Sequence, residues 1–335
     1  MSNNRFGCFS VVLVIVLGLS LLINLVLVAG KFTESVGDHI STGPRFDEAV
    51  VVPSKTNADQ KIALISLRGV ISGSQAGSVG QTMVDDLRIQ CKQAGDDPKI
   101  KAVVLCIDSP GGEVTASDVI YNAVKNLRDN SKKPVVVYMG SMAASGGYYA
   151  ACGGSWLIAN ETTFTGSIGV IMQSLNYQQL FGKVGLETLT FKSGKFKDML
   201  SGSRTVTEDE KDYIQGMIMQ TYSKFVGIVA KERNLPEDQL RAGLADGRVV
   251  SGKDALDGKL INQLGQIEDA YAKALEMANI KDATFVRYDA GFKLGKLFHM
   301  LGESEKAKIE IDLAKTLSPK MEAGRMYYLP SMYAQ

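Results

Sequence analysis

The chain has 335 residues, of which 45% are hydrophobic and 22% are charged, and its formal net charge is +1. A chain of this length can form one large domain or two smaller ones with a true hydrophobic core. The near-neutral charge gives no indication of a nucleic-acid partner, which would favour a basic surface. The four cysteines form no CxxC pair and join no histidine at metal-ligand spacing, so they predict structural thiols rather than a zinc site: Cys8, Cys91, Cys106 and Cys152.

An uncharged apolar segment occupies residues 7–30, close to the N-terminus. About 20 apolar residues span a bilayer, whereas the apolar core of a cleavable signal peptide has about 7–15, so we expect an uncleaved transmembrane anchor over residues 10–30. A long signal peptide cut near Ala29 is the alternative. Arg5 precedes the segment and acidic residues follow it, which favours a cytoplasmic N-terminus and places the bulk of the chain outside the cytoplasm.

Beyond a polar linker with one short strand, RFDEAVVV, predicted strands and helices alternate along the chain. Uninterrupted apolar strands that alternate with helices indicate an α/β domain whose strands are covered on both faces. We expect strands over residues 61–71, 99–108, 133–140, 155–160, 167–174 and 187–194. We expect helices over residues 78–94, around 119–127, after Ser145, from Thr207 to about Arg233, within 246–265, over 267–279 and over 303–315.

The pattern divides the chain into five parts. They are a cytoplasmic N-terminus (1–9), the anchor (10–30), the linker (31–59), the α/β domain (60–290) and a C-terminal tail (291–335). The tail loses the regular periodicity of the domain and ends in MYYLPSMYAQ, so we expect it to be mobile or to dock on another surface.

Ser145 lies in GSMAASGGYYAA, residues 140–151, directly after an apolar strand. A serine on a tight strand-to-helix turn can serve as a nucleophile, but its hydroxyl needs a base to accept the proton. The two histidines of the chain, His39 and His299, fall in the linker and the tail. A Ser-His-Asp triad is therefore not expected.

Lysine can replace histidine as the base where burial disfavours the ammonium form. The segment FKSGKFKDML, residues 191–200, follows an apolar strand and contains Lys195 and Lys197. In an extended chain both side chains would point the same way, so the pattern alone does not choose between them. A basic turn in solvent is the alternative interpretation of the segment.

Three glycine-bearing turns accompany these residues: SPGG (109–112), SGG (145–147) and TGSIG (165–169). Glycines allow backbone N–H groups to approach a ligand without a Cβ in the way, and such donors can hold a developing oxyanion. Each turn alone is also compatible with ordinary packing between a strand and a helix.

Taken together and in this order, SPGG, GSMAASGGYY, TGSIGVIMQSLNY, FKSGKFKD and DGRVVSG…LINQLG resemble the signal peptide peptidase A family in its short bacterial form. The resemblance covers about residues 60–285. It implies a Clp protease/crotonase-like α/β fold of repeated β-β-α units, preceded by one N-terminal transmembrane helix. It also implies a membrane-anchored serine endopeptidase that needs no metal or other cofactor.

The resemblance further implies a role for individual residues. Ser145 resembles the nucleophile, Lys197 rather than Lys195 the general base, Ser167 the hydroxyl that hydrogen-bonds the lysine, and Gly111, Gly112 and Gly146 the oxyanion and substrate-binding glycines. The resemblance also implies a homo-oligomeric ring with sites at protomer boundaries, so we hypothesise that Ser145 of one protomer works with Lys197 of the next, and a dyad within one chain stays open. The implied substrates are remnant signal peptides and unfolded or membrane polypeptides.

Two alternatives from other classes stay open at this point. A crotonase-type enzyme acting on acyl-CoA shares the fold and the oxyanion glycines, but it needs no serine–lysine pair. A catalytically inactive membrane scaffold of the same fold would not need the intact Ser145 and Lys197. Labelling of Ser145 by a fluorophosphonate separates the peptidase from both.

Overall fold

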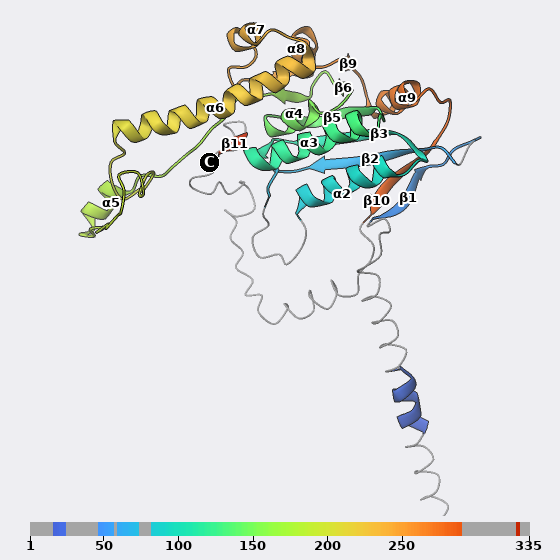
Figure 1. Ribbon diagram of the computed structural model, residues 1–335, viewed down its shortest axis with the longest axis horizontal. Helices are drawn as coiled ribbons and strands as arrows, with labels where there is room; N and C mark the ends of the chain where they lie inside the picture. Colours follow the sequence, from blue (N-terminus) through green and yellow to red (C-terminus); the bar gives the residue numbers. More distant parts are fainter. Residues whose placement is uncertain (1–15, 25–45, 57–58, 74–81, 290–325, 329–335) are drawn as a thin grey trace, which may run out of the picture. The chain divides into compact units, whose positions relative to one another are not determined.

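The computed structural model describes residues 16–24, 46–56, 59–73, 82–289 and 326–328 (Figure 1). The chain divides into two units, Met1–Pro44 and Arg45–Gln335. In the first unit, residues 16–24 form an exposed helix.

None of the helices in these described ranges is both long enough and apolar enough to cross a bilayer. Most of the predicted anchor, residues 10–30, lies outside the described residues, as does the helix predicted over residues 303–315.

A nine-stranded sheet, counted over the described part of the chain, forms the centre of the second unit. Its order is β1-β10-β2-β3-β5-β6-β9, and β7 pairs with both β5 and β8. All pairs are parallel apart from β1 with β10 and β7 with β8. The strands are β1 (Asp47–Val52), β2 (Lys61–Arg68), β3 (Ile100–Ser109), β5 (Val135–Ala144), β6 (Trp156–Ala159), β7 (Phe164–Gly166), β8 (Val249–Ser251), β9 (Gln263–Leu264) and β10 (Thr284–Asp289).

Helices cover both faces of this sheet and make a three-layered α/β unit (Figure 1). On one face the sheet shares a hydrophobic core with α2 (Met83–Asp96), α3 (Val114–Asn130), α4 (Gly146–Ala151) and the second half of α6 (Glu208–Arg233). On the other face, Ala270 and Ala274 of α9 (Ile267–Met277) pack against a smaller core. The shorter helices are α5 (Gln178–Lys183), α7 (Glu237–Ala242) and α8 (Gly252–Asp257).

Strand β3 shows why the continuous apolar runs are strands here. Val103, Leu105 and Ile107 belong to the larger core, whereas Ala102 and Val104 belong to the core beneath α9. Because successive side chains of a strand point to opposite faces, a strand with helices on both sides needs apolar residues at nearly every position. The predicted burial on both faces is confirmed.

Two predicted strands, residues 167–174 and 187–194, are wrong. The strand near the first is β7, which ends at Gly166, and residues 167–174 contain only an isolated bridge at Ile171. Residues 187–194 are exposed and pair with no other described segment. An apolar, β-branched sequence becomes a strand only where a neighbouring strand accepts its hydrogen bonds, which the local pattern does not reveal.

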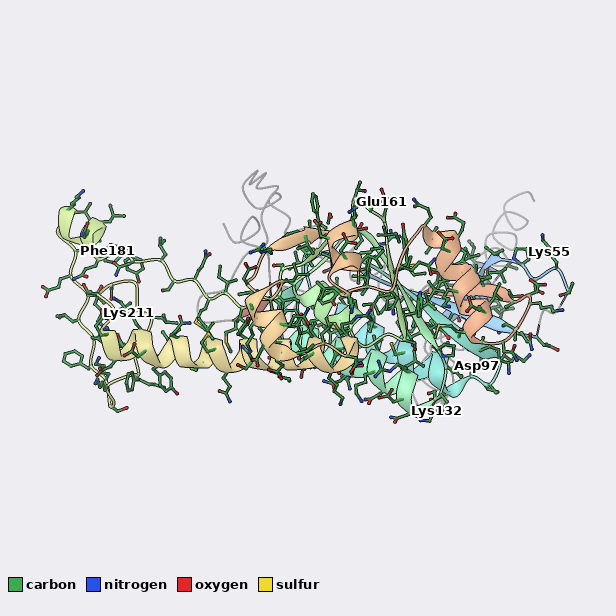
Figure 2. All side chains as sticks on the ribbon, turned by 90° about the horizontal axis from the view of Figure 1, so that it is seen from above. Lys55, Asp97, Lys132, Glu161, Phe181 and Lys211 are labelled. Atoms are coloured by element: carbon green, nitrogen blue, oxygen red, sulfur yellow. The ribbon has the colours of Figure 1, made fainter. Side chains whose placement is uncertain are left out.

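Helix α6 has 26 residues, so it is about 39 Å long. It begins with the predicted capping box, in which Thr207 and Glu210 each bond the other's backbone N–H. Its second half packs against the core through Phe225, Val226 and Val229. Its first half runs beyond the sheet beside residues 173–206, which we call the arm; the labels Phe181 and Lys211 mark this end in Figure 2.

Candidate active site

Ser145 lies on the turn between strand β5 and helix α4, as predicted. Its φ is +53° and its ψ is −117°, in a region that residues with a Cβ rarely adopt. The residue is only 1% exposed, and its Oγ has no hydrogen-bond partner among the described residues. A strained backbone and an unpaired buried hydroxyl make this serine the candidate nucleophile, since its side chain forms no capping bond to α4.

The SPGG turn packs directly against this serine turn. Gly111 has a φ of +102°, and a Cβ there would lie 2.6 Å from the Gly146 nitrogen. A Cβ on Gly146 would in turn lie 3.2 Å from the Gly112 nitrogen and from the Gly111 Cα. Glycine is required on both sides because the two backbones approach more closely than side chains allow. The structure therefore brings together the backbone N–H groups of Gly112 and Gly146.

Ile71 holds the SPGG turn in place from the other side. Its N–H donates to the Gly111 carbonyl at 2.8 Å, and its carbonyl accepts from the Glu113 N–H at 2.8 Å. A Cβ on Gly112 would lie 1.9 Å from the Ile71 oxygen, so no other residue fits there without a backbone shift. These bonds fix the backbone of the SPGG turn beside the serine turn.

Ser167 lies next to Ser145 at the same edge of the sheet. Strands β5 and β7 are parallel neighbours, with Ala144 paired to Gly166, and the two serines are the next residues along each strand. The Ser145 N–H donates to the Gly166 carbonyl at 2.8 Å. Ser167 is 3% exposed and also has a positive φ, of +50°. Both serines thus occupy strained positions at the ends of adjacent strands.

A short strand from the C-terminal tail lies beside these glycines. Strand β11 (Tyr327–Tyr328) pairs antiparallel with β4 (Gly112–Glu113), and Tyr328 lies opposite Gly112. On its other side, Tyr327 exchanges two backbone hydrogen bonds of 3.1 Å with Ile171. An extended segment is thus held between two stretches of backbone, and the Tyr328 oxygen lies only 2.1 Å from where a Cβ on Gly111 would be.

The Tyr328 side chain fills an aromatic pocket and is fully buried. Its ring stacks on Tyr149 of α4 at 5.0 Å between centroids and contacts Phe225 of α6 at 4.6 Å. Its hydroxyl lies 3.4 Å from the Thr221 carbonyl, and burial raises its pKa above the usual range. The tail therefore docks on the domain through these residues, one of the two outcomes expected for it.

Lys197 lies apart from this cluster, in a turn of the arm. Its side chain is exposed, and in the described parts of the chain its Nζ has no hydrogen-bond or ion-pair partner. Its neighbour Phe196 stacks on Tyr213, in the first half of α6, at 5.4 Å between centroids. Phe225, which packs on the helix that begins after Ser145, follows 12 residues later along α6, or about 18 Å along the helix axis. One chain therefore gathers Ser145, Ser167, Gly111, Gly112 and Gly146, but it leaves Lys197 at a distance.

Comparison with known proteins shows the family of the chain. A model of peptidase family S49 matches residues 128–281, and a model of the Clp proteases matches residues 59–161. A protein of Enterococcus faecium named signal peptide peptidase SppA is 36% identical over 234 residues, which are 69% of this chain and 67% of that protein. A protease of Synechocystis is 36% identical over 231 residues, covering 69% of this chain and 79% of the relative. The chain belongs to peptidase family S49.

The chain is therefore a serine peptidase with a Clp protease-like α/β fold, and the acyl-CoA alternative does not hold. It spans a smaller part of longer family members: Protease 4 of Salmonella typhi is 34% identical over 238 residues, which are 70% of this chain but 37% of that protein.

Several residues around the candidate site were not predicted from the sequence. Ile71, which holds the SPGG turn, carries no motif that separates it from an ordinary strand-end residue. The pairing of Tyr327 and Tyr328 with Glu113 and Gly112 joins segments more than 200 residues apart, beyond the reach of a local pattern. The two tyrosines of the MYY segment in the tail were the signal in the sequence that the tail docks on another surface.

Proposed function

We propose that the chain hydrolyses peptide bonds with Ser145 as nucleophile and Lys197 as general base. The observation that carries this proposal is the Ser145 turn, where a strained, buried and unpartnered hydroxyl lies beside the Gly112 and Gly146 N–H groups. Such a hydroxyl is held ready for attack and loses no existing hydrogen bond when it reacts.

In the first step the Ser145 Oγ attacks the carbonyl carbon of the scissile bond while the neutral Lys197 amine takes the hydroxyl proton. The Gly112 and Gly146 N–H groups donate to the oxyanion of the tetrahedral intermediate. The resulting lysine ammonium then gives its proton to the leaving amine, and an acyl-enzyme ester on Ser145 remains.

In the second step Lys197 takes a proton from water, and the hydroxide equivalent attacks the ester. Collapse of this intermediate releases the carboxyl product, and the lysine returns the proton to the Ser145 Oγ. Ser167, one residue past the β7 pairing with β5, is the hydroxyl we assign to hold the lysine amine in place. No metal or other cofactor takes part in either step of the reaction.

We infer that Lys197 comes from a second copy of the chain. Among the described residues, the hydrogen bonds, ion pairs and ring contacts of the arm join its own residues or the first turns of α6, and none reaches the Ser145 cluster. The arm also exposes a set of large apolar side chains, which is typical of a surface that another protein covers: Leu175, Leu180, Val184, Leu186, Leu189 and Phe191. A ring in which each arm reaches the next protomer satisfies both observations.

The substrate is an extended polypeptide that adds a strand between β4 and Ile171. The chain's own segment Tyr327–Tyr328 already lies there as a strand, which supports this mode of binding. Backbone hydrogen bonds carry little sequence information, so this mode suits remnant signal peptides and unfolded or membrane polypeptides. We place the peptidase domain outside the cytoplasm, anchored through residues 10–30.

A fluorophosphonate probe tests the nucleophile. The intact chain is expected to be labelled at Ser145, located by mass spectrometry of the digested protein, and Ser145→Ala is expected to take up no label. Label on another residue would overturn the assignment. A folded protein that reacts nowhere would favour an inactive scaffold.

A further inference from the structure

The residues on either side of Lys197 are fastened to the start of α6. Lys195 forms an ion pair with Asp209, and Phe196 stacks on Tyr213. The next residue, Asp198, is held more firmly, since its side chain is only 12% exposed. The exposed side chain of Lys197 therefore lies between residues that are held in place. The backbone N–H of Lys197 closes the turn by donating to the Gly194 carbonyl at 3.1 Å.

Asp198 is bound by two cations. Arg204 reaches both of its carboxylate oxygens, from Nε and from Nη2, each at 2.8 Å. The same Nη2 donates to the Asp198 backbone carbonyl at 3.2 Å, and Lys192 Nζ lies 2.6 Å from the carboxylate. A planar guanidinium that contacts both the side chain and the backbone of one residue fixes its orientation as well as its position.

Arg204 also binds a second carboxylate, that of Glu210. Its Nη1 donates to Glu210 Oε2 at 2.9 Å, and its Nη2 donates to Oε1. Glu210 is 1% exposed and accepts the Thr207 N–H at 2.9 Å, so it belongs to the capping box of α6. The guanidinium therefore ties the turn that carries Lys197 to the first turn of a long helix.

Both carboxylates are charged near neutral pH. The hydrogen bonds from Arg204 lower the pKa of Glu210 to about 2, and those from Arg204 and Lys192 hold the pKa of Asp198 well below its usual range. The cluster therefore does not titrate near neutral pH, and a change of pH in that range leaves it intact.

We propose that Asp198, Arg204 and Glu210 are positioning residues for Lys197. They hold the turn so that the lysine projects from the tip of the arm toward the Ser145 site of the next copy. This inference rests on the proposed role of Lys197 as the base. Correct placement of a catalytic group matters because a shift of about 1 Å can reduce the rate about 100-fold.

The test compares Arg204→Ala with two further variants in peptide hydrolysis by the full chain. Arg204→Ala is expected to lower kcat about 100-fold and to change KM less than about threefold, because Arg204 binds Asp198 and Glu210 and acts on the placement of Lys197 rather than on peptide binding. Arg204→Lys is expected to recover part of the rate, since one ammonium cannot bind both carboxylates in the same way. Lys211→Ala, which removes the exposed pair with Glu208 in the same helical turn, is the matched control and is expected to keep full activity.

Assembly and thermal unfolding are measured alongside, and Asp198→Asn, which keeps the side-chain shape, covers the case in which Arg204→Ala does not assemble. The double variant Lys197→Ala/Arg204→Ala is expected to be no less active than Lys197→Ala, because the cluster acts through the lysine. If assembled Arg204→Ala and Asp198→Asn keep the full kcat while Lys197→Ala is inactive, the positioning role is overturned and the dyad stands. If Lys197→Ala itself is active, the proposed dyad fails, and the positioning role fails with it.

Discussion

The domain around Ser145 and the arm around Lys197 are built in opposite ways. The Ser145 turn is surrounded by close backbone contacts, with two glycine turns packed within a few ångströms and the serine 1% exposed. The arm makes its contacts with itself and the first turns of α6, and Phe191 at its apolar surface is 96% exposed. The Ser145 turn is packed tightly within a single chain, and the arm has the features of a surface that a second chain covers.

Ser145→Ala tests the domain side of this comparison with the largest expected effect. Removal of the nucleophile is expected to lower kcat by at least about a thousandfold. The fold should be unchanged, because the Oγ has no partner to lose. Initial rates and thermal unfolding of the purified variant check both points, and substantial residual turnover from a pure sample would remove Ser145 from the mechanism.

Gly112→Ala tests how tightly the glycine turns are packed. The added Cβ would lie 1.9 Å from the Ile71 oxygen, so the turn must move. We expect a loss of stability of about 1–3 kcal/mol and a fall in kcat of about 100-fold, since the oxyanion donor moves with the turn. Gly182→Ala in the arm is the matched control, because nothing lies within 4 Å of its added Cβ. Equal effects of the two substitutions on Tm would contradict the contrast between the regions.

Phe191→Ser tests whether the arm packs on a second copy of the chain. The side chain is 96% exposed in one chain, so the stability of the isolated chain should change by less than about 0.5 kcal/mol. If the arm packs on a second copy, the dissociation constant of the assembly should rise about tenfold. Analytical ultracentrifugation over a dilution series measures this, with Glu187→Ala as a polar control on the arm. An unchanged dissociation constant would exclude Phe191 from the interface.

Tyr328→Ala has the smallest expected effect, and it tests the strand position between β4 and Ile171. Loss of the ring contacts with Tyr149 and Phe225 should release the tail and lower KM for a short peptide several-fold. Tyr328→Phe keeps the rings and loses only the long 3.4 Å contact with the Thr221 carbonyl, so its KM should stay close to that of the parent chain. A higher KM in Tyr328→Ala would mean that the tail helps to build the groove rather than compete for it.

Features that depend on neighbouring residues in the chain could be predicted from the sequence. The turn of Ser145, the glycines before and after it, and the capping box of α6 are each encoded within a few residues. Strand β10 was not predicted, because it pairs with β2, more than 200 residues away. Predicted strands at 167–174 and 187–194 had suitable residues but no neighbouring strand. The distance between Lys197 and Ser145 follows from the length of α6 and from the place where α6 packs on the core. No sequence motif encodes this distance.

The central claim is that Ser145 of one copy works with Lys197 of another, and mixing two inactive variants tests it most directly. Ser145→Ala and Lys197→Ala are combined in equal amounts under conditions that exchange subunits, and exchange is verified with differently tagged chains. A site shared between chains predicts that activity returns, to at most about a quarter of the parent value for random pairing in a ring. Verified exchange with no recovered activity would contradict the account, because it would show that each chain carries its own complete dyad.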